Sequence, residues 1–112
     1  MDAPASVLSQ MLAVRVHLDR CSSENGPLRV IAGSHLSGKL GERQLADLVG
    51  HTGGVEITAA RGSIVLMRPL LVHSSSAARA AEHRRVLHVE FAPLEAISPL
   101  KWHTAVQLRR AA

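Results

Sequence analysis

His73 and Arg84 are the residues of this chain whose type and spacing best fit a chemical site. His73 closes an apolar segment and is followed by three serines, so its ring can lie beside a core with room for a ligand. Arg84 opens an alternating segment, and an antiparallel return across residues 74–82 would bring it near His73. Neutral imidazole is a good ligand for Fe(II), and the arginine fork binds a carboxylate by two parallel hydrogen bonds. The pair therefore suggests a site for iron and a keto-acid co-substrate.

His17 and Asp19 form a second candidate pair. Residues two apart on a strand share a face, so both side chains could reach one metal ion, as in a two-histidine, one-carboxylate triad. The alternative is a polar strand end, in which Asp19 caps a hairpin at Asn25-Gly26. The residues alone leave both interpretations open.

The other histidines and nucleophiles carry weaker signals. His35 follows Gly33-Ser34 and is expected to stabilise a turn, while His88 could line a pocket with Arg84 or pair with Glu90. The remaining histidines are expected to be solvated; they are His51, His83 and His103. The serines at 74–76 lack the turn that exposes a hydrolase nucleophile, and Cys21 has no partner, so hydrolytic and thiol chemistry are disfavoured.

Alternation and turn residues predict several short strands that would position these side chains. We expect strands at residues 11–19, 28–31, 55–59, 63–67, 70–74 and 84–91, with the first two joined as a hairpin through Asn25-Gly26. Pro69 indicates a bend or an edge position. Short helices are expected at residues 42–49 and 104–110. This pattern is typical of an all-β sandwich or barrel.

Composition limits the class of partner. The only aromatic residues are Phe91 and Trp102, so the core should be aliphatic and stacking platforms for nucleic acid are lacking. The net charge of +4 comes from scattered arginines, which favours anionic small molecules over nucleic acid. A single cysteine, no membrane-length apolar run and no signal pattern predict a cytoplasmic protein.

Three ordered motifs resemble the phytanoyl-CoA dioxygenase family: residues 25–35 (NGPLRVIAGSH), 66–75 (LMRPLLVHSS) and 83–92 (HRRVLHVEFA). Members of this family are Fe(II)- and 2-oxoglutarate-dependent oxygenases with a mainly β, double-stranded β-helix fold of the jelly-roll or cupin type. The resemblance runs from about Leu12 to Trp102. It implies that His73 is an iron ligand, that Arg84 binds the far carboxylate of 2-oxoglutarate, and that Ser75 hydrogen-bonds the same carboxylate. The substrates would be a small molecule and O₂.

The chain departs from the family pattern at its start. There the His-X-Asp iron motif lies upstream of the strand that carries His17 and Asp19, so the motif is expected to precede Met1. Residues 1–112 are then a single domain, the C-terminal portion of an N-terminally incomplete jelly roll, inactive alone and with open strand edges that favour self-association. Two alternatives stay open. One is a non-catalytic jelly-roll binding domain, and the other is a small cupin-type metal protein using His17, Asp19 and His73.

Overall fold

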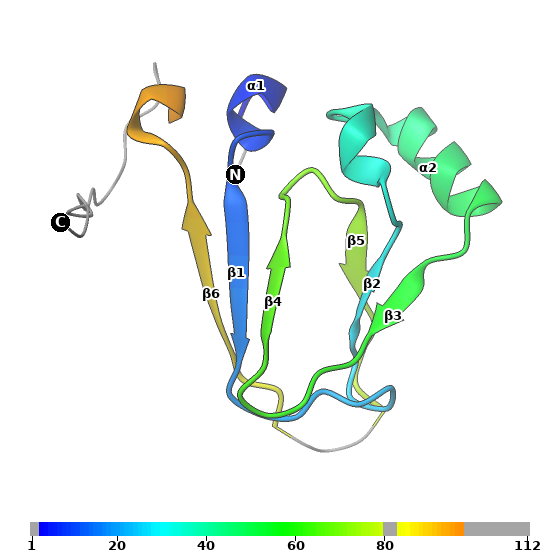
Figure 1. The fold of residues 1–112 in the computed structure, drawn as a ribbon. Coiled ribbons are helices and arrows are strands. Elements are labelled where there is room, and N and C mark those ends of the chain that lie inside the picture. Colours follow the sequence, from blue (N-terminus) through cyan, green and yellow to red (C-terminus); the bar gives the residue numbers. More distant parts are fainter. Residues whose placement is uncertain (1–2, 80–82, 98–112) are drawn as a thin grey trace, which may run out of the picture.

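The computed structural model describes residues 3–79 and 83–97, which form six short strands and a few short helices (Figure 1). The strands are β1 (Leu12–His17), β2 (Leu28–Val30), β3 (Val55–Ile57), β4 (Ile64–Met67), β5 (His73–Ser75) and β6 (Val86–Phe91). The helices are α1 (Ala5–Leu8), α2 (Glu42–His51) and the 3₁₀ turns η1 (Ser34–Ser37) and η2 (Leu94–Ile97).

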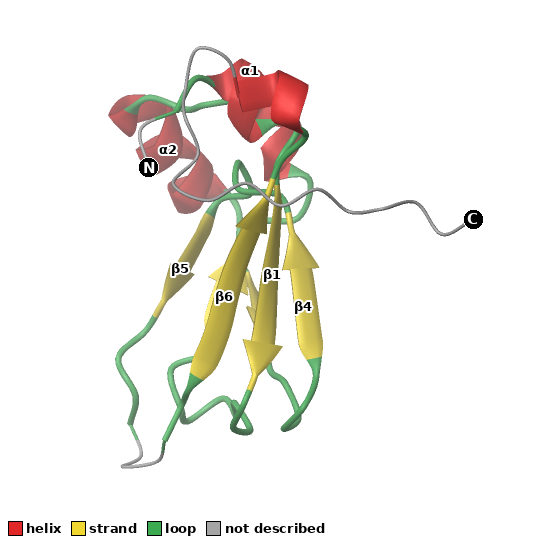
Figure 2. Ribbon diagram, turned by 90° about the vertical axis from the view of Figure 1, so that its left-hand side faces the viewer, coloured by secondary structure: helices red, strands yellow, loops and turns green. Residues whose placement is uncertain are grey.

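The strands form two antiparallel sheets of three strands each. In the β1 sheet the order is β4-β1-β6, and in the β2 sheet it is β3-β2-β5. Figure 2 shows them as two layers, with the β1 sheet in front. The chain passes from one sheet to the other between β1 and β2, and again after β3, β4 and β5. This mainly β, two-sheet arrangement is the fold class predicted from the sequence.

The predicted hairpin between residues 11–19 and 28–31 is wrong. β1 pairs with β4 and β6, and β2 pairs with β3 and β5, so these two strands belong to different sheets. The turn at Asn25-Gly26 is real, with Gly26 at a positive φ of 62°. Its conformation only reverses the chain, however, and the long-range pairing partners decide which sheet each strand joins.

Several predicted elements keep their type but change their length. Helix α2 continues to His51, past Gly50, rather than ending at Val49. β5 begins only at His73, and β6 begins at Val86, so Arg84 precedes its strand. The helix predicted at residues 104–110 lies outside the described residues.

The two faces of the β1 sheet differ in an unexpected way. The inner face, which turns toward the β2 sheet, carries Ala13, Arg15 and His17 of β1, of which Ala13 and His17 are buried. The outer face carries mostly apolar residues of β1, β4 and β6, and five of them are exposed: Ile64, Leu66, Leu87, Val89 and Phe91. The polar face of β1 is therefore the better covered one.

The described apolar core lies at one end of the sheets instead of between them. It consists of Ala3, Val7 and Met11, with Leu8 and Ala92 packed against it. Helix α1 and η2 meet there, next to the ends of β1 and β6 (Figure 1). On the inner face of the β1 sheet the buried apolar residues are Ala13 and Met67, which pair across β1 and β4.

Strand β5 is an edge strand within the described residues. Its one partner is β2, in a register that places His73 opposite Val30 and Ser75 opposite Leu28. Its other side presents backbone groups that a further strand could pair with. No helix in the described part of the chain has the length and apolar character needed to cross a bilayer.

Asp19 fixes the approach to β6. Its carboxylate accepts hydrogen bonds from Nε and Nη2 of Arg85, at 2.9 and 3.0 Å, and from the backbone N–H of Arg85 at 2.9 Å. The suggestion that Asp19 caps a hairpin at Asn25-Gly26 is therefore wrong. The side-chain hydrogen bonds from Arg85, followed by its backbone hydrogen bond, hold the pKa of Asp19 well below its ordinary value.

We predict that Asp19→Asn destabilises the protein at neutral pH and that this effect fades in acid. A carboxyl whose pKa is depressed by folding contributes stability above its unfolded pKa, about 4, and that contribution is lost as pH falls toward the folded value. Urea denaturation of both proteins at pH 7 and at several values below pH 4 measures it. A difference in the free energy of unfolding that does not change with pH would contradict the role given to the Asp19–Arg85 pair.

Candidate functional site

The imidazole of His73 is held by a hydrogen bond to a nearby backbone carbonyl. Its Nδ1 lies 2.6 Å from the carbonyl oxygen of Leu71. A carbonyl can only accept, so Nδ1 carries the proton and the lone pair is on Nε2. Metal-binding histidines are commonly fixed by such a second bond. The side chain is exposed, so Nε2 is accessible to an ion.

Ser75 lies on the same face of β5 as His73, because residues two apart on a strand share a face. The strand rise separates the two by roughly 7 Å along β5. Ser75 pairs with Leu28, which directly follows the Asn25-Gly26-Pro27 turn. The hydroxyl is therefore displaced from His73 toward that turn.

Arg84 is anchored to the same turn by its guanidinium. Nη1 donates to the carbonyl oxygen of Asn25, at 3.3 Å, and to that of Gly26. Asn25 is fully buried, and its Nδ2 donates to the carbonyl oxygens of His83, at 3.2 Å, and Arg20, at 3.4 Å. Among the described residues Arg84 uses only one of its three nitrogens, so its other donors can meet a carboxylate.

Gly26 brings Arg84 and the serine segment together. A Cβ at this position would collide with Nη1 of Arg84 and with the carbonyl oxygen of Ser76. Ser76, just after β5, and Arg84, just before β6, therefore both lie against Gly26, although β5 and β6 belong to different sheets. The expected proximity of Arg84 and the segment after His73 arises here, at the turn, and not through pairing of neighbouring strands.

His17 and Asp19 do not join His73. They lie at the end of β1 in the other sheet, and Asp19 is bound by Arg85. Within residues 3–79 and 83–97 there is no group of three or more His, Cys, Asp or Glu side chains that could hold a metal ion. The alternative of an intact site made by His17, Asp19 and His73 is therefore wrong.

Ser34 supports the segment that leads into His73, and the sequence did not reveal this role. Its buried hydroxyl donates to the carbonyl oxygen of Ile31 at 2.7 Å and accepts from the backbone N–H of Val72 at 2.8 Å. This fixes the residue just before His73. The Gly33-Ser34 pair was the available signal, but it indicated a turn and not a brace. His35 itself lies in η1, consistent with a turn role.

His88 pairs with Glu90, one of the two roles expected for it. Nε2 of His88 lies 3.5 Å from Oε1 of Glu90, and both side chains are on the inner face of the β1 sheet. His51 lies at the end of α2, with Nδ1 2.7 Å from the carbonyl oxygen of Asp47. It is exposed, as predicted.

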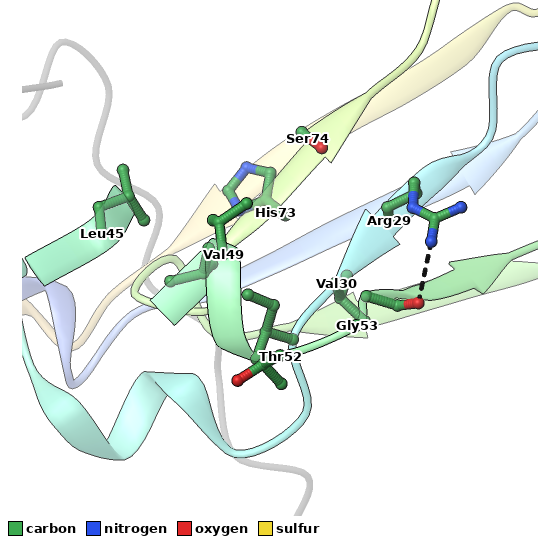
Figure 3. Close-up of a pocket in the computed structure, with 11 residues that line it drawn as sticks. Arg29, Val30, Leu45, Val49, Thr52, Gly53, His73 and Ser74 are labelled. Atoms are coloured by element: carbon green, nitrogen blue, oxygen red, sulfur yellow. Dashed lines mark hydrogen bonds between the residues drawn. The ribbon is translucent and has the colours of Figure 1, made fainter. Parts of the chain in front are cut away.

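A cavity of about 500 Å³ lies beside His73, between helix α2 and strands β2 and β5 (Figure 3). Leu45 and Val49 of α2 and Val30 of β2 line it, together with His73 and Ser74. The lining is mixed, because Arg29 and Thr52 also contribute polar side chains beside these aliphatic ones. Such a cavity can take the carbon skeleton of a small molecule next to the imidazole of His73.

Comparison with protein-family models finds a match to phytanoyl-CoA dioxygenase (PhyH) over residues 3–86. Among solved structures, EctD from S. alaskensis with 2-oxoglutarate and 5-hydroxyectoine superimposes with a TM-score of 0.67 at 27% identity, covering 77% of this chain and 32% of that one. The same protein with bound Fe gives 0.66 at 28% identity, covering 77% and 32%.

AviO1 from Streptomyces viridochromogenes Tue57 gives a TM-score of 0.69 at 26% identity, covering 78% of this chain and 38% of that one. The chain thus spans about a third of the length of these structures. A comparison with curated protein sequences returned no match.

Gly26→Ala should be far more harmful than Gly33→Ala. Both glycines have positive φ, 62° and 76°, but only Gly26 has atoms in the way of a Cβ. Gly33→Ala should cost about 1 kcal/mol of backbone strain, whereas Gly26→Ala adds displacement of Arg84 and should cost at least about 2 kcal/mol. Chemical denaturation measures both, and equal costs would show that the close approach at Gly26 is unimportant.

Proposed function

The chain belongs to the phytanoyl-CoA dioxygenase family, and from this premise we propose that it carries one iron ligand and the 2-oxoglutarate anchor of an Fe(II)- and 2-oxoglutarate-dependent oxygenase site. In this proposal His73 binds iron through Nε2. Arg84 and Ser75 bind the far carboxylate of 2-oxoglutarate.

One observation carries the proposal: the hydrogen bond to Leu71 fixes the tautomer of His73 at the start of β5. Ser75 ends the same strand, on the side where Arg84 is tied to the Asn25-Gly26 turn. The Leu71 carbonyl leaves Nε2 open for a metal. Ser75 lies further along β5, opposite Leu28, and the next residue, Ser76, meets the guanidinium of Arg84 at Gly26. This separation suits a five-carbon keto acid whose two ends bind at different places.

The described residues fit the iron only in part, because they offer His73 without two further ligands. The remaining ligands would come from a segment that adds to this one. When bound, iron and 2-oxoglutarate supply the oxidation of a C–H bond by O₂, with 2-oxoglutarate converted to succinate and CO₂. The roles of this chain are to orient the keto acid through Arg84 and Ser75 and to hold an apolar substrate away from water in the cavity beside His73.

The second candidate is a non-catalytic jelly-roll binding domain. It is favoured by the absence of a full metal-ligand group among the described residues. In that case Arg84 and Ser75 would bind a carboxylate with no need for metal. The two candidates differ in whether iron strengthens the binding of 2-oxoglutarate once the complementary segment is present.

The partners proposed are a small-molecule substrate and O₂, with no nucleic acid. The scattered arginines and the near absence of aromatic residues support this. Self-association through strand edges is also proposed, since the unpaired side of β5 can accept a strand.

Substitution of Ser75 or Arg84 should weaken the binding of 2-oxoglutarate by the 112-residue chain. Ser75→Ala, which removes an exposed hydroxyl with no partner in the described structure, should weaken binding about tenfold, the usual effect of one hydrogen bond to a charged group. Arg84→Lys keeps the charge but loses the fork and should weaken it further. Ligand-observed NMR measures both, with Arg61→Lys in an exposed turn as the matched control. Unchanged binding in the first two variants would refute the proposed anchor.

Iron should bind weakly to this chain alone, because one imidazole cannot hold Fe(II) tightly. Calorimetry under anaerobic conditions should show no stoichiometric binding at micromolar concentrations. Joining the chain to an upstream His-X-Asp segment of a family member should restore binding and succinate formation, and His73→Ala should then remove both. Tight binding by the isolated 112 residues would overturn the assignment of a partial site.

A further inference from the structure

Arg15 is at the centre of the inner face of the β1 sheet. It lies on the central strand, opposite His88 of β6 and Val65 of β4. Its neighbours on β1 that share this face, Ala13 and His17, are both buried. Its side chain therefore extends into the space between the two sheets.

The guanidinium of Arg15 has no partner within the described structure. Nε is buried and makes no hydrogen bond, and no ion pair involves this residue. The carboxylate of Glu90 is on the same face but pairs with His88. The residue as a whole is half-buried, and Nε is the part of the guanidinium that is enclosed without a partner. A buried N–H without a hydrogen bond costs free energy, and an anion bound between the sheets would remove that cost.

His17 adds a second unpartnered polar atom to this face. Its ring is 5% exposed, and Nδ1 is buried without a hydrogen bond. Burial, and then the charge of Arg15, lower the pKa of His17 below its ordinary value, which favours the neutral ring. A neutral His17 adds no charge beside Arg15, so the full charges on this part of the inner face are those of Arg15 on β1 and Glu90 on β6.

The position of Arg15 relates it to the proposed site. His88, its neighbour on β6, is four residues beyond Arg84, or roughly 13 Å along an extended chain. His73 is three residues from Ser76, which meets Arg84 at Gly26, or roughly 10 Å. Arg15 and His73 thus lie in opposite sheets, each a few residues along the chain from a segment that meets at Gly26.

We propose that Arg15 binds a carboxylate in the space between the sheets, at a subsite separate from the Arg84 anchor. This inference rests on the proposed function, because it places a second carboxylate of a bound molecule at the end of the proposed site that carries His73. The carboxylate belongs either to the keto-acid end of 2-oxoglutarate or to a substrate that is itself an organic acid. In both cases Arg15 supplies a positive charge for an anion on the β1 side of the space between the sheets.

The experiment follows the Nε–H resonance of Arg15 in ¹⁵N-correlated NMR spectra of the 112-residue chain. This signal is protected by burial and is assigned by its loss in Arg15→Met. It should shift on titration with 2-oxoglutarate, or with acetate added to protein saturated with 2-oxoglutarate. A shift with 2-oxoglutarate that Arg84→Lys weakens assigns Arg15 to the co-substrate, and a shift that needs acetate assigns it to the substrate.

The controls separate this inference from the proposed function. If 2-oxoglutarate binds through Ser75 and Arg84 but neither acid moves the Arg15 signal, the Arg15 subsite is overturned and the proposed function stands. If acetate moves the signal while 2-oxoglutarate does not bind, the subsite stands and the proposed function fails. Arg61→Met, with the same loss of charge at an exposed position, should leave both titrations unchanged.

A stability measurement tests the purely structural alternative, in which Arg15 serves Glu90. Arg15→Met should leave the unfolding midpoint of the ligand-free chain unchanged or raise it, since it removes a buried Nε–H that makes no hydrogen bond. Glu90→Gln should leave the acetate-dependent shift intact. Equal destabilisation by Arg15→Met and Glu90→Gln, together with loss of the shift in Glu90→Gln, would overturn the proposal.

Discussion

The close approach of the Arg84 guanidinium to the backbone of Asn25 and Gly26 is the contact on which the arrangement of the site depends. It ties together the start of β2, the segment after β5 and the approach to β6, which belong to two sheets. The buried amide of Asn25 strengthens the same junction through His83. Because a glycine is required where these chains meet, the position of the Arg84 guanidinium is set by backbone packing and not by the choice of neighbouring side chains.

The sequence predicted the types of most elements and the pairing of His88 with Glu90, because alternation and short-range spacing are local properties. It could not predict which strands pair. The Asn25-Gly26 turn suggested a hairpin, yet β1 and β2 belong to different sheets, since pairing is decided by segments that lie far along the chain. Alternation in β1 also revealed two faces without revealing which one is covered. For this reason the sequence suggested His17 and Asp19 as metal ligands and gave no sign that Arg15 lies between the sheets.

The β1 sheet places its polar face inward and its aliphatic face outward. The described cluster of buried apolar residues lies at the α1 end, and Ala13 and Met67 are buried on the inner face of the β1 sheet. The same face carries Arg15, His17 and Glu90, and polar groups arranged for binding are commonly held at some cost in stability. The exposed aliphatic residues on the outer face form a surface of the kind that other protein segments cover.

The edge position of β5 has a consequence for how a metal site could be completed accurately. Backbone pairing with an added strand depends little on sequence, so pairing alone would accept several alignments. A slip of one residue turns every side chain of the added strand to the opposite face, away from the face that carries His73. Only one parity can then place further ligands beside His73, and the ion would stabilise that alignment over the others. A metal ion bound at His73 would therefore select the strand register, because a shifted strand could not form the same coordination bonds.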